Sequence, residues 1–222
     1  EMSPVYRDWF LRQPTAVIEA AYREYRQQLQ LLHWQRPHDG HWVLKAPLHL
    51  YAIGALLTLF PDAAIILIHR DPIRVIPSLC SLSSILLDSM TDDPERHDAL
   101  GPLIVSWVAE GLRRAEAARA HAKPGRIYDL GYHELMADPL GAVQGLYAHF
   151  GYPYTPEFEA RAIAWLKAHP QHKHGEHRYT LEEFGLDRQM IDDTFSWYRA
   201  RHRIPPEPAI ASNVPEPGSI PD

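Results

Sequence analysis

The stretch from Ala63 to Met90 constrains the fold most, because an apolar run passes there directly into a helical pattern. The six apolar residues Ala63 to Ile68 follow the turn signal Phe60-Pro61-Asp62, and a short run rich in isoleucine predicts a buried strand. Asp71 and Pro72 then suit the N-cap and the first position of a helix. Strands buried in this way belong to parallel sheets that helices cover on both faces.

The order of the other elements predicts one three-layer α/β domain with a parallel sheet flanked by helices. Apolar residues recur at helical spacing in six further segments, which are residues 13–35, 47–60, 101–120, 135–150, 156–169 and 186–198. Short strands are expected at 41–44 and 126–130, and the polar run 91–98 predicts a surface loop. Residues 204–222 are rich in proline and poor in large apolar residues, so we expect a domain at 1–203 and a disordered tail after it.

The composition limits the classes of partner. A net charge of −6 gives no basic surface suited to nucleic acid, so any anion site must be local. The single cysteine, Cys80, cannot form an intrachain disulfide and lies on the apolar face of its helix, which predicts a buried thiol in a reducing compartment. No apolar run approaches the ~20 residues that span a bilayer, and no signal peptide opens the chain. These features favour a cytoplasmic protein without a membrane span.

Arg70 occupies the junction between the predicted strand and helix. Ligands of open α/β sheets bind beyond the carboxyl ends of the strands, where helix N-termini offer free N–H groups to anions. The planar guanidinium of Arg70 suits a phosphate group, and Ser78, two helical turns further on, can donate a hydroxyl. The alternative for Arg70 is a salt bridge to a carboxylate such as Asp71 or Asp138.

A similar arrangement is expected earlier in the chain. The predicted strand at 41–44 would deliver Lys45 to its end, and Pro47 fits the first position of the next helix. His49 would then lie one helical turn inside, on the same rim as Lys45. The alternatives are a solvated lysine and a histidine that only caps or covers the helix.

Three of these motifs resemble the sulfotransferases that use 3′-phosphoadenosine 5′-phosphosulfate, especially a bacterial branch with an LKxPxH stretch followed by HRDP and a serine. They are residues 42–50 (WVLKAPLHL), residues 69–72 (HRDP) and Pro77-Ser78. The resemblance continues at 132–139 and 177–186 and spans about residues 15 to 200. It implies a P-loop architecture and sulfuryl transfer to a hydroxyl or amine of a small-molecule, glycan or peptide acceptor.

The resemblance also implies roles for single residues in holding the donor. Arg70 and Ser78 match the arginine and serine that hold the 3′-phosphate of the nucleotide. Tyr132 matches a tyrosine that lies against the adenine, and Lys173 or Arg178 would close over the nucleotide. The scheme needs no metal.

The reacting groups follow from the same likeness. Lys45 matches the lysine that stabilises charge on the bridging oxygen of the leaving nucleotide. Cytosolic members place a histidine two residues after that lysine, where this chain has Pro47. His49 is the nearest replacement, and a neutral imidazole with an ordinary pKa of about 6.5 suits a general base. A carboxylate from an N-terminal part of the protein is the alternative base.

One family element is missing from the sequence. A loop of the PRSGTT type, whose backbone N–H groups wrap the 5′-phosphosulfate, does not occur between Glu1 and Trp42. The chain also begins at Glu1 without a methionine. We therefore expect an N-terminal truncation that has removed a strand, this loop and a helix.

Three other functions stay open at this point. A nucleotide kinase would ordinarily show GxxxxGK[ST] and an acidic magnesium ligand, but the carboxylate at a strand end here, Asp71, serves as a cap. A non-catalytic nucleotide-binding or partner protein of the same fold would not need the missing loop. A zinc module would rest on the histidines of one polar loop, without a cysteine or a helical pair; they are His169, His172, His174 and His177.

Overall fold

The computed structural model describes residues 4–89, 96–170 and 180–208, which group into two compact units. Within these residues, unit 1 comprises 4–68, 107–130 and 141–154. Unit 2 comprises 69–89, 96–106, 131–140, 155–170 and 180–208. The division of the chain into a domain at 1–203 and a tail stays a prediction, and residues 209–222 lie outside the described part.

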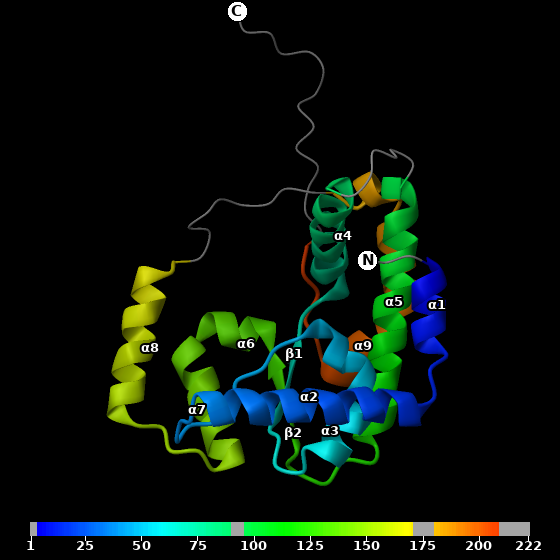
Figure 1. Cartoon of the computed structure of the whole chain (residues 1–222). Coiled ribbons are helices and arrows are strands. Elements are labelled where there is room, and N and C mark those ends of the chain that lie inside the picture. Colours follow the sequence, from blue (N-terminus) through cyan, green and yellow to red (C-terminus); the bar gives the residue numbers. More distant parts are fainter. Residues whose placement is uncertain (1–3, 90–95, 171–179, 209–222) are drawn as a thin grey trace, which may run out of the picture. The chain divides into compact units, whose positions relative to one another are not determined.

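Unit 1 is built around a short parallel sheet. Among the described residues this sheet has two strands, β1 (Ile65–His69) and β2 (Ile127–Gly131), which are hydrogen-bonded to each other. The last residue of each strand, His69 and Gly131, belongs to unit 2. Ile65 packs with Ile53 and Ala115 in a buried apolar cluster. The helices of this unit are α1 (Pro4–Leu11), α2 (Thr15–Gln35), the 3-10 helix η1 (Pro47–Ala52), α3 (Ile53–Leu59), the later half of α5 (Arg96–Arg119) and most of α7 (Pro139–Phe150). Figure 1 shows α2 lying along α3, against which it packs.

Unit 2 is helical, and within it α4 (Pro72–Asp88) and α9 (Arg188–His202) pack against each other. Apolar side chains of both helices are fully buried, among them Ile73, Ile76, Ile191 and Phe195. Cys80 is buried as predicted, and burial raises the pKa of its thiol to about 12. The other helices are the first half of α5, α6 (Tyr132–Ala137), α8 (Pro156–Ala168) and the 3-10 helix η2 (Glu182–Phe184).

The strand and the helix around Arg70 were predicted correctly, but the prediction that the strand is buried was wrong, because Ile66 and Ile68 are exposed. β1 covers most of the predicted strand, and α4 begins at Pro72 with Asp71 as its N-cap, whose carboxylate accepts a hydrogen bond from the Ile73 N–H at 3.1 Å. A proline at this position has no N–H to leave unpaired, and its fixed φ suits the first turn of a helix.

The predicted strand at 41–44 is wrong. Residues 41–46 have no regular secondary structure, and Trp42, Val43 and Leu44 are exposed. A strand needs a neighbour for its backbone hydrogen bonds, and β1 and β2 make up the whole sheet among the described residues. Lys45 therefore follows an irregular segment and does not stand at a strand end.

The predicted helix at 135–150 is two helices, α6 and α7, separated at Asp138. A residue that precedes proline is disfavoured in the helical conformation, and Asp138 before Pro139 adopts φ −144° and ψ 84°. α6 begins already at Tyr132, where the Glu134 carboxylate accepts a hydrogen bond from the Gly131 N–H at 3.1 Å. The predicted loop at 91–98 also ends early, because α5 begins at Arg96.

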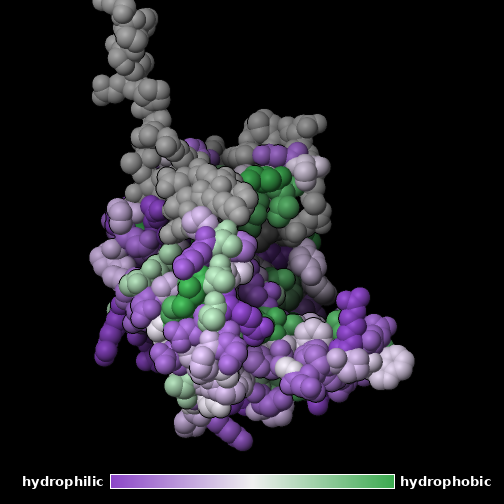
Figure 2. All heavy atoms as spheres, turned by 90° about the vertical axis from the view of Figure 1, so that its left-hand side faces the viewer, coloured by the Kyte–Doolittle hydropathy of each residue, from purple (hydrophilic) through white to green (hydrophobic). Residues whose placement is uncertain are grey.

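The surface has the character expected from the net charge of −6. On the face drawn in Figure 2, hydrophilic side chains predominate and hydrophobic ones form small groups. Two residues of β1, Ile66 and Ile68, are among the exposed apolar residues of the structure. Among the described helices, none combines the length and the apolar character needed to cross a lipid bilayer.

Candidate active site

Arg70, which the sequence predicts to bind a phosphate, contacts another predicted site residue. It lies between the end of β1 and the N-cap of α4, and its side chain is 29% exposed. The guanidinium lies over the ring of Tyr132, 4.2 Å from the ring centroid, in a cation–π contact. The structure thus brings together two of the residues predicted to bind the nucleotide.

The guanidinium of Arg70 also binds a carboxylate, that of Glu207. Arg70 Nε donates to Glu207 Oε1 at 3.1 Å, and Arg70 Nη2 donates to Glu207 Oε2 at 3.0 Å. Two parallel N–H···O bonds of this kind are the fork geometry with which arginine recognises carboxylate and phosphate groups. The salt bridge considered as the alternative reading of Arg70 is therefore present, and Glu207 is a partner in it.

Asp71 has a structural role beside this arginine. It is 1% exposed, and its Oδ1 accepts a hydrogen bond from Arg199 Nε at 2.7 Å, while its Oδ2 accepts one from the Glu207 backbone N–H at 2.8 Å. Arg199 is also paired with Asp192. Burial would lower the pKa of Arg199, but hydrogen bonds to Asp192 and Asp71 outweigh it and raise that pKa. The Asp71 carboxylate is thus fully used in folding and not available to a magnesium ion.

Ser78 lies two turns along α4 and is exposed. It follows the buried Pro77, and α4 continues through this proline. An exposed hydroxyl in unit 2, on the helix that begins next to Arg70, can donate a hydrogen bond to a ligand. The role in phosphate binding that the sequence resemblance implies for Ser78 stays a prediction.

Lys45 and His49 lie in unit 1. Lys45 is exposed. His49 is half-buried in η1, and its Nδ1 lies 2.6 Å from the hydroxyl oxygen of Tyr22. The rings of Tyr22 and Tyr25 lie 5.7 and 5.9 Å from the imidazole, between ring centroids.

This environment favours neutral side chains. Burial lowers the pKa of His49 below its ordinary value, and burial together with the nearby Tyr25 raises the pKa of Tyr22 to about 12. In the tautomer that carries hydrogen on Nδ1, this nitrogen donates to the Tyr22 oxygen and Nε2 keeps a lone pair. A neutral imidazole with a free lone pair is what general-base catalysis requires.

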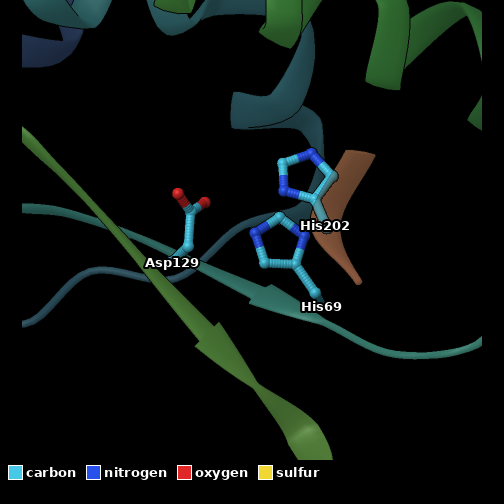
Figure 3. A group of neighbouring side chains, drawn as sticks. All are labelled: His69, Asp129 and His202. Carbon is cyan, nitrogen blue, oxygen red and sulfur yellow. The ribbon is translucent and has the colours of Figure 1, made fainter. Parts of the chain in front are cut away.

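Two histidines of unit 2 stack against each other. His69, at the end of β1, and His202, at the end of α9, stack with ring centroids 3.9 Å apart, as Figure 3 shows. His69 Nδ1 is also 2.7 Å from the hydroxyl oxygen of Tyr198. Asp129, drawn in the same figure, belongs to unit 1, where it forms an ion pair with Arg119.

Some predicted residues lie outside the described part of the chain. Lys173 and Arg178 are among them, as are three of the four histidines of the hypothetical zinc loop, so their predicted roles stay predictions. His169 is described, and its Nδ1 lies 2.9 Å from the carbonyl oxygen of Trp165 in α8.

Sequence reasoning missed Glu207, Arg74 and Arg199. Arg74 follows Arg70 by one helical turn, a spacing that could have indicated a second cation on the same rim. Glu207 stands between Pro206 and Pro208 in a segment interpreted as a tail. Prolines on both sides restrict the backbone, and this was the one signal of order near Glu207.

Comparison with known proteins identifies the family. Residues 5–156 match the model of the sulfotransferase family. The chain is 31% identical over 170 residues to the omega-hydroxy-beta-dihydromenaquinone-9 sulfotransferase Stf3 of Mycobacterium bovis. The aligned region covers 75% of this chain and 43% of that protein. The same named protein of Mycobacterium tuberculosis matches to the same extent.

Two solved structures share the fold. The sulfotransferase STF9 of Mycobacterium avium is 33% identical with a TM-score of 0.75, over 85% of this chain and 48% of that one. The sulfotransferase STF1 of Mycobacterium tuberculosis is 31% identical with a TM-score of 0.71, over 88% and 49%. The chain thus spans about half the length of the relatives that it matches. The family match and these similarities confirm the resemblance and the P-loop-like α/β fold: the chain belongs to the sulfotransferase family.

Proposed function

We propose that the protein transfers a sulfuryl group from 3′-phosphoadenosine 5′-phosphosulfate to the hydroxyl of a small-molecule acceptor. The observation that carries this proposal is the state of Arg70, whose guanidinium binds a carboxylate through two N–H groups at a strand–helix junction. A phosphate presents the same pair of oxygens to this fork. Membership of the sulfotransferase family favours the sulfuryl donor over other phosphorylated ligands.

The donor would be held through its adenosine 3′-phosphate end in unit 2. Arg70 and Ser78 bind the 3′-phosphate in this proposal, and Tyr132 supports the guanidinium on one face and borders the adenine. Lys173 or Arg178, both outside the described residues, would close over the nucleotide. This end of the donor is what distinguishes it from adenosine 5′-phosphosulfate, so the arrangement would select the donor before any transfer takes place.

His49 and Lys45 would act in the transfer step itself. The acceptor oxygen attacks sulfur while the bond between sulfur and the bridging oxygen of the 5′-phosphate breaks, and the acceptor proton passes to Nε2 of His49. Lys45 neutralises the negative charge that develops on the bridging oxygen. In the tautomer with hydrogen on Nδ1, the Tyr22 oxygen accepts a hydrogen bond from Nδ1 and Nε2 is free to take the proton. No metal ion is needed in this scheme, because positioned cations stabilise the charge.

The acceptor is proposed from the relatives. The name of the Stf3 proteins assigns them an omega-hydroxylated menaquinone derivative, a small molecule with a hydroxyl group. We therefore favour a hydroxyl of a small apolar molecule over an amine, a glycan or a peptide. The cytoplasmic location expected from the sequence belongs to the same proposal.

Calorimetric titration with adenosine 3′,5′-bisphosphate tests the donor assignment. The wild-type chain should bind this product nucleotide, and Arg70→Ala should weaken binding at least about tenfold, since it removes two charge-assisted hydrogen bonds. Arg161→Ala is the matched control, because Arg161 is an exposed arginine of α8 and has no proposed role. Equal affinities of wild type and Arg70→Ala would contradict the assignment. A folded chain that does not bind the nucleotide would favour the non-catalytic alternative.

A further inference from the structure

Two arginines of unit 2 face the same carboxylate. Besides its two bonds from Arg70, Glu207 lies near Arg74, with 3.9 Å between Arg74 Nε and Glu207 Oε2. Oε2 therefore lies next to cations on two sides, at 3.0 and 3.9 Å. Two guanidiniums close to one anionic group can also bind a phosphate dianion, which carries twice the charge of a carboxylate.

The segment that carries Glu207 is held in place by contacts that do not involve its carboxylate. Ile204 is 8% exposed and its N–H donates to the Arg199 carbonyl oxygen at 3.0 Å. The Glu207 N–H donates to Asp71 Oδ2 at 2.8 Å, and Arg74 Nη1 donates to the Pro208 carbonyl oxygen at 3.3 Å. We call residues 204–208 the C-terminal strap. Its three prolines lower the entropy lost when it is ordered.

We propose that the Glu207 carboxylate occupies the position of the nucleotide 3′-phosphate, so that the C-terminal strap competes with the donor, and that Arg74 is a second arginine of this phosphate site. The inference rests on the proposed function, since Arg70 cannot serve the phosphate and Glu207 with the same N–H groups at once. Binding of the nucleotide thus requires Glu207 to leave, while the strap can stay anchored through Asp71.

The expected size of the competition follows from the exposure of the pair. The side chains of Arg70 and Glu207 are 29% and 30% exposed, so water screens their attraction and the ion pair is of moderate strength. A competitor inside the protein lowers the apparent affinity by the fraction of molecules in which the site is free. We therefore expect Glu207→Gln to tighten binding of adenosine 3′,5′-bisphosphate by about three- to tenfold.

The test compares two nucleotides on matched variants by calorimetry. Adenosine 3′,5′-bisphosphate carries the 3′-phosphate and adenosine 5′-phosphate lacks it. Glu207→Gln should tighten binding of the first about three- to tenfold and leave the second unchanged. Glu182→Gln is the control, because it removes an exposed carboxylate of the same unit away from the strap. An equal gain for both nucleotides would show a general effect of charge and overturn the competition.

Arg74→Gln tests the second arginine. It should weaken binding of the bisphosphate several-fold and leave that of adenosine 5′-phosphate unchanged, whereas a residue that only holds the strap would, when replaced, tighten binding. If the bisphosphate binds wild type and Glu207→Gln equally, the competition is refuted while the proposed function stands. If it binds none of the folded variants, the proposed donor is refuted and the inference with it. Far-UV circular dichroism of each variant verifies that it is folded.

Discussion

Replacing Asp71 by alanine tests whether the carboxylate behind Arg70 holds unit 2 together. Asp71 is 1% exposed and caps α4 through the Ile73 N–H. It also pairs with Arg199 at 2.7 Å and accepts the Glu207 N–H at 2.8 Å. Alanine removes all three interactions at once.

The cost can be worked from these contacts. Removing one partner of a buried ion pair costs about 3–5 kcal/mol. Arg199 keeps Asp192 and is 17% exposed, so we reduce this to about 2 kcal/mol. Loss of the N-cap adds about 1 kcal/mol, and loss of the hydrogen bond from the Glu207 N–H adds about 1 kcal/mol more. The total of about 4 kcal/mol corresponds to a fall in Tm of about 8–16 °C for a chain of this length.

Asp187→Ala is the matched control, because Asp187 also caps a helix of unit 2 and is exposed. Its carboxylate accepts a hydrogen bond from the Met190 N–H at 2.7 Å, at the start of α9. This variant should lose about 1 kcal/mol, the cap alone. Urea unfolding followed by far-UV circular dichroism measures both free energies. If Asp71→Ala loses no more than Asp187→Ala, the buried ion pair contributes nothing and the reasoning is refuted.

Two further predictions concern packing and pH. Gly101→Ala should lower the free energy of unfolding by at least about 2 kcal/mol in the same urea assay, because the added Cβ would clash with the Phe184 carbonyl oxygen. Gly54→Ala is the control and should not lower it, because the nearest atom to its Cβ would be 3.9 Å away. Because burial lowers the pKa of His49 in the folded state, unfolding should become easier as the pH falls below about 6.5, the unfolded value, and His49→Gln should reduce this loss. His121→Gln, which changes an exposed histidine, is the control; an identical pH dependence in both variants would refute the assignment.

Sequence reasoning succeeded where the signal lies within a few residues. The apolar run before Arg70 predicted a strand there, and the Asp71-Pro72 pair predicted the start of α4, because helix capping depends on neighbouring residues. It failed for residues 41–44, which carry large apolar side chains as a strand would. Whether such a segment becomes a strand depends on a neighbour for its hydrogen bonds, and that neighbour is not encoded in the segment itself.

Only part of the surroundings of Arg70 was predictable from the sequence. Arg70 and Tyr132 were found from the family motifs and do meet, but Glu207 reaches Arg70 across 137 positions and Arg199 reaches Asp71 across 128. Periodicity carries no information at such separations. The two readings of Arg70, a phosphate ligand and a partner of a carboxylate, were treated as alternatives. The N–H groups of a guanidinium can donate to two oxygens of either group, so the carboxylate found at Arg70 is compatible with the proposed phosphate site.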